Sequence, residues 1–189
     1  MMDDSPTIVN VVGTGDLNAS INLEHLYTVA ENDITTVRYD PEHHQGCYLR
    51  FGEDGSLITI YNSGKYIIRS ESLKKIHKER HKLLKYFLQA GITKSIDQVC
   101  FDINNIVGVA SLNREIALGP LSEDLTNGNA NYIEPDGRLE YHLNDNTCTV
   151  NIYRTGKIVL MGANSSKKFE QAWENLSQEI NLLFEDKSI

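Results

Sequence analysis

The chain has 189 residues, 40% of them hydrophobic and 23% charged, so it can bury the core of one domain or of two small halves sharing one. Its net charge of −8 argues against nonspecific affinity for nucleic acid, and no run approaches the ~18 apolar residues of a membrane-spanning helix. Three cysteines without a CxxC pair argue against a disulfide framework or a zinc knuckle. The acidic N-terminus MMDDSPT does not resemble a secretory signal, so we expect a cytoplasmic protein.

The most informative feature is an internal repeat of about 90 residues. The segment TIVNVVGTGDLN at 7–18 aligns without a gap with DINNIVGVASLN at 102–113, and ITIYNSGKYII at 58–68 aligns with VNIYRTGKIVL at 150–160. Solenoid units repeat every ~20–50 residues, so this period is too long for a solenoid. It predicts a duplicated α+β unit in one pseudo-twofold body. A surface built by both repeats would suit a ligand with its own twofold character, and duplex DNA is the obvious one.

The first repeat opens with a β-branched strand, Ile8–Thr14, followed by a short helix with Asn22 as a plausible N-cap. Helical spacing predicts that Leu23, Leu26 and Val29 are buried. Short strands follow, separated by the turn sequences DPEHHQG, GEDGS and NSG. The repeat ends in a long amphipathic helix. Its apolar stripe carries Ile76, Leu83 and Phe87.

The second repeat has the same order. Its opening strand is Phe101–Val109, and Pro120 falls where the first turn of a helix tolerates proline. The closing helix carries an apolar stripe of Phe169, Trp173, Leu176 and Ile180. A set of strands followed by a helix, twice, implies an antiparallel sheet with helices on one face. The other face is then open to solvent or to a ligand.

Strand alternation predicts which side chains that open face carries. From 58 to 69 the face toward the helices is apolar: Ile58, Ile60, Tyr66 and Ile68. The opposite face has Thr59, Tyr61, Ser63, Lys65, Ile67 and Arg69, and its counterpart in the second repeat has Asn151, Tyr153, Thr155, Lys157, Val159 and Met161. A solvated face would usually be more polar. This mixture of β-branched residues, hydroxyls and one lysine from each repeat suits a partly apolar ligand.

These motifs resemble the archaeal-type core of the TATA-box-binding protein family, over nearly the whole chain. IVNVVGTGDL at 8–17 and NNIVG at 104–108 are similar to the family's two opening strands. YDPEHHQGCYLRF at 39–51 is similar to its YEPExFPGLxYR segment, and NSGKYII and RTGKIVL are similar to its SGKxVxTG segment. The resemblance implies an α+β saddle made of two pseudo-symmetric repeats, 1–93 and 94–189. Its curved antiparallel sheet would carry the helices on the convex face.

The resemblance also implies a general transcription initiation factor that binds A·T-rich promoter DNA in the minor groove and is associated with the nucleoid. Asn10 and Asn105 would lie at the centre, where their amides reach the acceptors of A·T pairs. Val12, Val107, Ile67 and Val159 would pack on the floor of the groove. Lys65 and Lys157, with Arg50 and Arg69, would contact phosphates, which positions the protein without reading sequence.

The chain departs from the family at its DNA-kinking wedges. The family inserts two phenylalanines per half between base steps, an example that general accounts of minor-groove binding also use. At the aligned positions this chain has His44 and Tyr61 in the first half, and Tyr153 with Asp136 or a gap in the second. The second loop of the saddle's edge (its stirrup), EPDGRLEY, is about two residues shorter than in the family. Further replacements are Thr59 and Asn151 for an apolar floor residue, Arg69 and Met161 for a threonine, and His142 for an arginine. Strong TATA specificity and full bending are therefore not expected, least of all in the second half.

By resemblance, a transcription factor B-like protein would dock near Glu134, and an acidic partner could bind the basic helix at 71–91. The alternative is a diverged paralogue that acts as a protein-interaction module or as a weak, non-bending DNA binder. No P-loop, GxGxxG or nucleophile with a local base is present, so we expect neither enzyme activity nor a cofactor. His77 and His81 lie four apart on the basic helix but lack a third ligand nearby, so we expect no metal site.

Overall fold

The computed structural model describes residues 5–33, 36–96, 99–126, 128–143 and 148–185. These residues form two compact units, one from residues 10–104 and the other from residues 1–9 with 105–189. We call them the first and the second unit. Each carries five antiparallel strands and two α-helices, in the predicted order of a strand, a short helix, several strands and a long helix. The opening strand of each repeat crosses the boundary between the units, so that residues 7–9 count with the second unit and residues 100–104 with the first. Among the described residues, no helix is long and apolar enough to cross a membrane.

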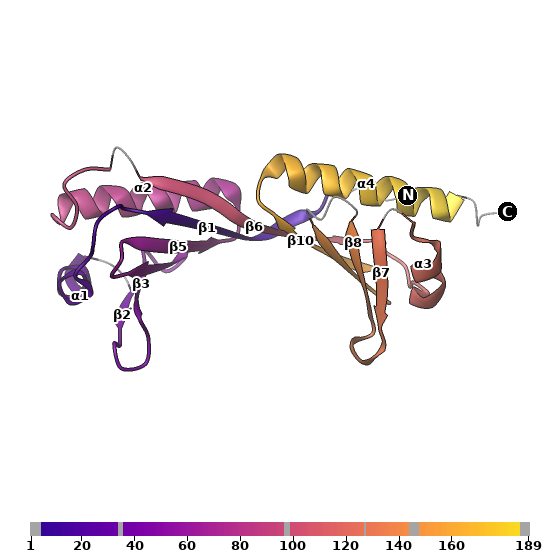
Figure 1. Cartoon of the computed structure of the whole chain (residues 1–189), viewed down its shortest axis with the longest axis horizontal. Coiled ribbons are helices and arrows are strands. Elements are labelled where there is room, and N and C mark those ends of the chain that lie inside the picture. Colours follow the sequence, from indigo (N-terminus) through magenta and orange to yellow (C-terminus); the bar gives the residue numbers. More distant parts are fainter. Residues whose placement is uncertain (1–4, 34–35, 97–98, 127, 144–147, 186–189) are drawn as a thin grey trace. The chain divides into compact units, whose positions relative to one another are not determined.

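In the first unit the strand order is β2-β3-β4-β5-β1, and every neighbouring pair is antiparallel (Figure 1). Its elements are β1 (Thr7–Asp16), α1 (Leu23–Asp33), β2 (Thr36–Tyr39), β3 (Gly46–Arg50), β4 (Leu57–Tyr61), β5 (Lys65–Ser70) and α2 (Leu73–Gln89). Helix α2 packs on β5, and α1 packs on β2 and β3.

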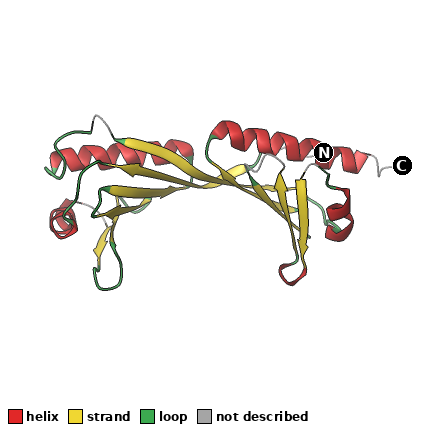
Figure 2. Ribbon diagram, viewed as in Figure 1, coloured by secondary structure: helices red, strands yellow, loops and turns green. Residues whose placement is uncertain are grey.

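The second unit repeats this arrangement with the strand order β7-β8-β9-β10-β6 (Figure 2). Its elements are β6 (Cys100–Ser111), α3 (Leu118–Asp124), β7 (Gly128–Ile133), the 3-10 turn η1 (Glu134–Asp136), β8 (Arg138–Leu143), β9 (Thr149–Tyr153), β10 (Lys157–Ala163) and α4 (Ser166–Glu185). Helix α4 packs on β10, and α3 packs on β7 and β8.

The cores lie between the sheets and their helices, and the predicted stripes are confirmed. The side chains expected to be buried on α2 and α4 are 8% exposed or less: Ile76, Leu83, Phe87, Phe169, Trp173, Leu176 and Ile180. The inward-facing strand residues Ile58, Ile60, Tyr66 and Ile68 are fully buried. Period 3.6 in helices and period 2 in strands therefore orient both layers as expected.

Asn22 caps α1, as predicted, because its Oδ1 accepts a hydrogen bond from the backbone N–H of His25 at 3.0 Å. The apolar stripe of this helix is only partly as expected. Leu23 and Leu26 are buried, whereas Val29 is half-buried and Ala30 takes the inner position. The prediction for Val29 was therefore wrong by one residue, because Ala30 lies four residues after Leu26 and shares its face.

Candidate nucleic-acid interface

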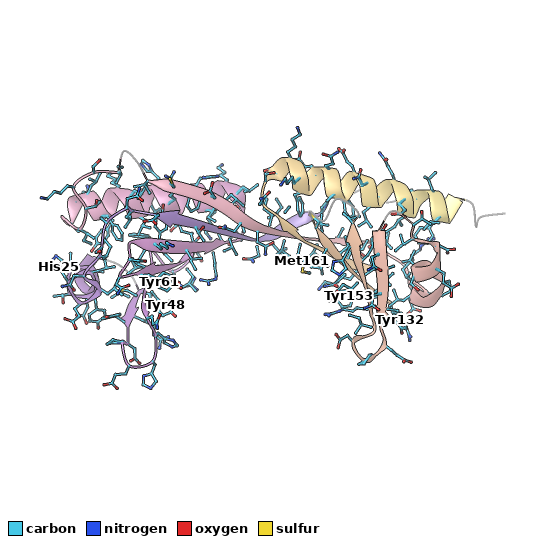
Figure 3. The ribbon with its side chains drawn as sticks, in the orientation of Figure 1. His25, Tyr48, Tyr61, Tyr132, Tyr153 and Met161 are labelled. Carbon is cyan, nitrogen blue, oxygen red and sulfur yellow. The ribbon has the colours of Figure 1, made fainter. Side chains whose placement is uncertain are left out.

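The face of the first sheet that points away from α2 is not covered by any described helix. It carries the residues that alternate with the buried ones: Val12 and Thr14 on β1; Lys65, Ile67 and Arg69 on β5; Leu57, Thr59 and Tyr61 on β4; Tyr48 and Arg50 on β3; and Arg38 on β2. Figure 3 shows Tyr48 and Tyr61 on this side of the sheet. We call this surface the first open face.

Cross-strand register gives the first open face a row of β-branched and aromatic residues flanked by cations, with one acid, Asp16, opposite Lys65. Ile67 lies between Thr14 and Thr59, and Thr59 lies opposite Tyr48. The cations are Arg38, Arg50, Lys65 and Arg69, and none of them forms an ion pair with a carboxylate in the described part of the chain. A surface of this kind offers an apolar floor with positive charge around it.

Two of these arginines are held by neutral groups. Arg50 donates from Nη1 to the carbonyl oxygen of Gly55 at 2.8 Å, and Arg69 donates from Nη1 to Thr59 Oγ1 at 3.3 Å. Thr59 is only 2% exposed even though it belongs to the open face. Neither bond neutralises charge, so both guanidinium groups keep their attraction for an anion such as phosphate.

A hollow of about 430 Å³ lies at the β2–β3 end of the first open face. It is lined by Arg38, Asp40, His44, Tyr48, Arg50 and Leu57. The rings of His44 and Tyr48 meet edge to face with centroids 5.8 Å apart. The wedge position predicted at His44 therefore has a second aromatic ring beside it.

The second sheet has a corresponding second open face on the side away from α4. It carries Val107 and Val109 on β6; Lys157, Val159 and Met161 on β10; Thr149, Asn151 and Tyr153 on β9; and Arg138, Glu140 and His142 on β8. Tyr153 and Met161 are labelled in Figure 3 on this side of the sheet. Asn151 is only 7% exposed, like its counterpart Thr59.

The predicted central asparagine Asn105 has a fixed amide orientation. The N–H of Gly162, at a bulge in β10, donates to Asn105 Oδ1 at 2.9 Å. Since the oxygen is engaged by the sheet, the amide NH₂ is the end that can donate to another molecule. The side chain thus satisfies a polar atom of the sheet through its oxygen and leaves its NH₂ available.

Glu140 distinguishes the second open face from the first. Its Oε1 lies 3.0 Å from His142 Nε2, and its Oε2 lies 3.6 Å from Arg138 Nη2. The same arginine nitrogen lies 3.5 Å from Asp136 Oδ2 in the β7–β8 connection. Arg138 is therefore shared between two carboxylates.

The predicted residues lie on the open faces of both units. Val12, Ile67, Lys65, Arg50, Arg69 and Tyr61 share the first open face, and Val107, Val159, Lys157 and Tyr153 share the second. Sequence reasoning missed Arg38, Tyr48, Arg138 and Glu140. The alternation with Arg50 could have revealed Tyr48, whereas Arg38 joins the face only through its pairing opposite Tyr48.

A sequence profile of the family described as "Transcription factor TFIID (or TATA-binding protein, TBP)" matches residues 5–90 and 100–183, which covers both repeats. The chain belongs to the TATA-binding protein (TBP) family. It is 32% identical to TATA-box-binding protein C of Halobacterium salinarum over 181 residues, which is 93% of this chain and 97% of that protein. It is 27% identical to the TATA-box-binding protein of Archaeoglobus fulgidus over 97% of this chain and 98% of that protein.

The solved structure of Methanococcus jannaschii TBP superposes with a TM-score of 0.76 at 26% identity, covering 94% of this chain and 99% of that one. This match confirms the fold class predicted from the repeat, a duplicated α+β unit of TBP type. TBP family membership also makes the chain a TBP-like transcription initiation factor.

Proposed function

We propose that this protein acts on chromosomal DNA in the cytoplasm, binding A·T-rich promoter DNA in the minor groove through its two open faces and recruiting other initiation factors. The observation that carries the proposal is the uncovered face of each sheet, where an apolar floor lies beside cations. A·T pairs show only acceptors in the minor groove, so a donor amide and β-branched residues suit that surface.

The asparagines supply the sequence-reading part of this proposal. Asn105 offers its NH₂ because its oxygen is occupied by Gly162, and Asn10 holds the equivalent position in the first repeat. Lys65, Lys157 and the first-face arginines would contact phosphates. His44, Tyr61 and Tyr153 would stack on or wedge between bases, and Asp136 would not, because a carboxylate is repelled by the phosphate backbone.

The first prediction tests base reading. The double variant Asn10→Ala, Asn105→Ala should keep most phosphate contacts but lose roughly 1–3 kcal/mol of preference for A·T over G·C duplex per removed contact. Electrophoretic mobility and fluorescence assays of duplex bending would measure affinity and distortion on both duplexes.

The matched control is Asn175→Ala, an exposed asparagine on α4 that lies on neither open face. It should bind like wild type. If the double variant keeps both affinity and A·T preference, the asparagines do not read bases, and an absence of any duplex binding by wild type would refute the proposed function itself.

Two protein partners belong to the same proposal. A transcription factor B-like protein would dock near the exposed Glu134 in η1. An acidic partner would bind α2, where Lys74, Lys75, Lys78 and Lys82 line a hollow of about 620 Å³ beside loop 51–55. Lys75 and Lys82 already pair with Glu71 and Glu79, so Lys74 and Lys78 would supply most of the attraction.

A second function has its own support. Glu140 and Asp136 on the second unit and the net charge of −8 favour a protein-interaction module, or a weak binder that does not bend DNA. The bending assay separates the two functions, because a non-bending binder would show affinity without a change in the end-to-end distance of the duplex.

A further inference from the structure

The two open faces differ at one pair of equivalent positions. In the first unit, Tyr48 on β3 lies opposite Thr59. In the second unit, Glu140 on β8 lies opposite Asn151, the counterpart of Thr59. A carboxylate therefore stands at the point of the second face where the first face has an aromatic ring.

The neighbours of Glu140 form one connected polar group. Its carboxylate contacts Arg138 at 3.6 Å and His142 at 3.0 Å, and His142 Nδ1 lies 3.2 Å from Thr149 Oγ1. Arg138 is 3.5 Å from Asp136 as well. The side chain of Glu140 is 27% exposed and that of Arg138 is 30% exposed, so both remain within reach of a bound molecule.

The equivalent positions of the first face have no acid. Arg50 stands where the second face has His142, and its guanidinium is bonded to a backbone carbonyl. Gly46 stands where the second face has Arg138, since each lies opposite the tyrosine that ends the neighbouring strand. At these positions the first face presents an arginine without an ion pair among the described residues and the second presents an arginine held by carboxylates, whereas Lys65 and Lys157 are present on one face each.

We propose that Glu140 makes the second open face a poor surface for phosphate, so that the first unit supplies most of the electrostatic affinity for DNA. Glu140 acts in two ways: its charge repels a phosphate close by, and together with Asp136 it holds the guanidinium of Arg138, so that its loss leaves this cation with one carboxylate instead of two. This inference rests on the proposed function, because it names which residues set the strength of binding at that interface.

The test changes the charge at the equivalent positions 140 and 48 in the full-length chain. Glu140→Gln removes the charge with little change of shape, and it should tighten binding to an A·T-rich duplex roughly fivefold at low salt. Freeing Arg138 for one phosphate should also steepen the plot of log affinity against log salt by about 0.9. The opposite exchange, Tyr48→Glu on the first face, should weaken binding and flatten the same plot.

Two controls isolate the mechanism. Glu174→Gln makes the same change of net charge on the exposed surface of α4 and should alter affinity less than about twofold, because solvent screens distant charges. Arg138→Ala should have little effect in the wild-type background. In the Glu140→Gln background it should reduce the gain to the part that comes from removing the charge of Glu140 itself, and it should restore the wild-type salt slope. A purely structural role for Glu140 would not produce this dependence on Arg138.

Each outcome decides the inference. Tighter binding by Glu140→Gln, with a steeper salt plot that Arg138→Ala returns to the wild-type slope, supports it. If wild type binds duplex and Glu140→Gln behaves like Glu174→Gln, the inference is overturned and the proposed function stands. If neither wild type nor Glu140→Gln binds duplex, both fall together. Glu140→Tyr, which copies the first unit, repeats the test should Glu140→Gln lower the melting temperature.

Discussion

At the residue scale, the three cysteines differ in how far their thiols are buried. Cys47 lies on the inner side of β3 and is fully buried, and this burial raises the pKa of its thiol to about 11. Cys148 is 4% exposed, whereas Cys100 is exposed at the start of β6. The thiolate is the reactive form, so a raised pKa leaves less of it at any pH below 11.

Only one thiol should therefore react quickly with Ellman's reagent at mildly alkaline pH. The rapid phase should belong to Cys100, and Cys100→Ser should remove it while leaving the slow phase of the two buried thiols. Denaturation should make all three equally fast. A second fast thiol in the native protein would contradict the burial of Cys47 or Cys148.

The sequence could predict single residues where strand alternation decides their side, as for Ile67 and Val159. It could not predict contacts that depend on pairing between strands. Alternation within β8 is enough to place Glu140 on one face with Arg138 and His142, but its position opposite Asn151 depends on the register between β8 and β9. Arg38 was overlooked for the same reason.

At the element scale, the β4–β5 and β9–β10 hairpins depend on glycine. Gly64 and Gly156 have φ angles of +86° and +82°, which side chains rarely adopt. A Cβ at Gly64 would come within 2.1 Å of the carbonyl oxygen of Ala19, and one at Gly156 within 2.2 Å of that of Arg114. Each turn is therefore packed against the loop that follows the first strand of its repeat.

Gly64→Ala should destabilise the protein by more than about 1–2 kcal/mol, the usual cost of a left-handed alanine, because the clash with a backbone oxygen adds to it. Urea unfolding followed by circular dichroism would measure the change. Gly119→Ala in α3 is the control: no atom lies within 4 Å of its Cβ position, so it should be neutral or slightly stabilising. Equal stability of the two variants would show that the turn tolerates a side chain.

Helices were the easiest elements to predict, because an apolar stripe at spacing three and four survives over many turns. The stripe of α2 predicted Ile76, Leu83 and Phe87 correctly, all of them fully buried. The short helix α1 offered only three turns, and there Ala30 took the place predicted for Val29. Alanine gives a weak hydrophobic signal, so its inward position was hard to recognise.

At the scale of the whole molecule, the net charge has the same sign as DNA, whereas the first open face carries cations. The net charge of −8 repels DNA at long range, while the four cations of the first open face attract it at contact. A Debye length of about 8 Å at physiological ionic strength screens the first effect more than the second. Electrostatic steering should therefore be weak.

The association rate constant should change less than about threefold when salt rises from roughly 50 to 300 mM, whereas dissociation should accelerate strongly. Stopped-flow fluorescence with labelled duplex would give both constants. Neutralising distant acids, as in Glu170→Gln with Glu174→Gln, should raise association at low salt and leave dissociation alone. An association rate that falls steeply with salt in wild type would show that the local cations outweigh the net charge even at a distance.

The duplication and the family could both be recognised from the sequence, because each motif recurs in order in the two repeats. The difference in charge between the two open faces could not be recognised from the sequence. It depends on the register that places Glu140 opposite Asn151. Similar motifs therefore predicted one fold, and the replaced wedge residues indicated a different second half, whereas the carboxylate of Glu140 opposite Asn151 appeared only in three dimensions.

The corner after the first strand of each repeat shows what the two copies have inherited. Asn18 and Asn113 both have left-handed backbones, with φ of 52° and 54°, which asparagine tolerates better than most residues. The N–H of Asn18 is held by an aspartate, Asp16, at 2.8 Å, and that of Asn113 by a serine, Ser111, at 3.1 Å. The same left-handed bend therefore occurs in both units although different side chains hold it, so the path of the backbone here tolerates exchange of the residue that caps it.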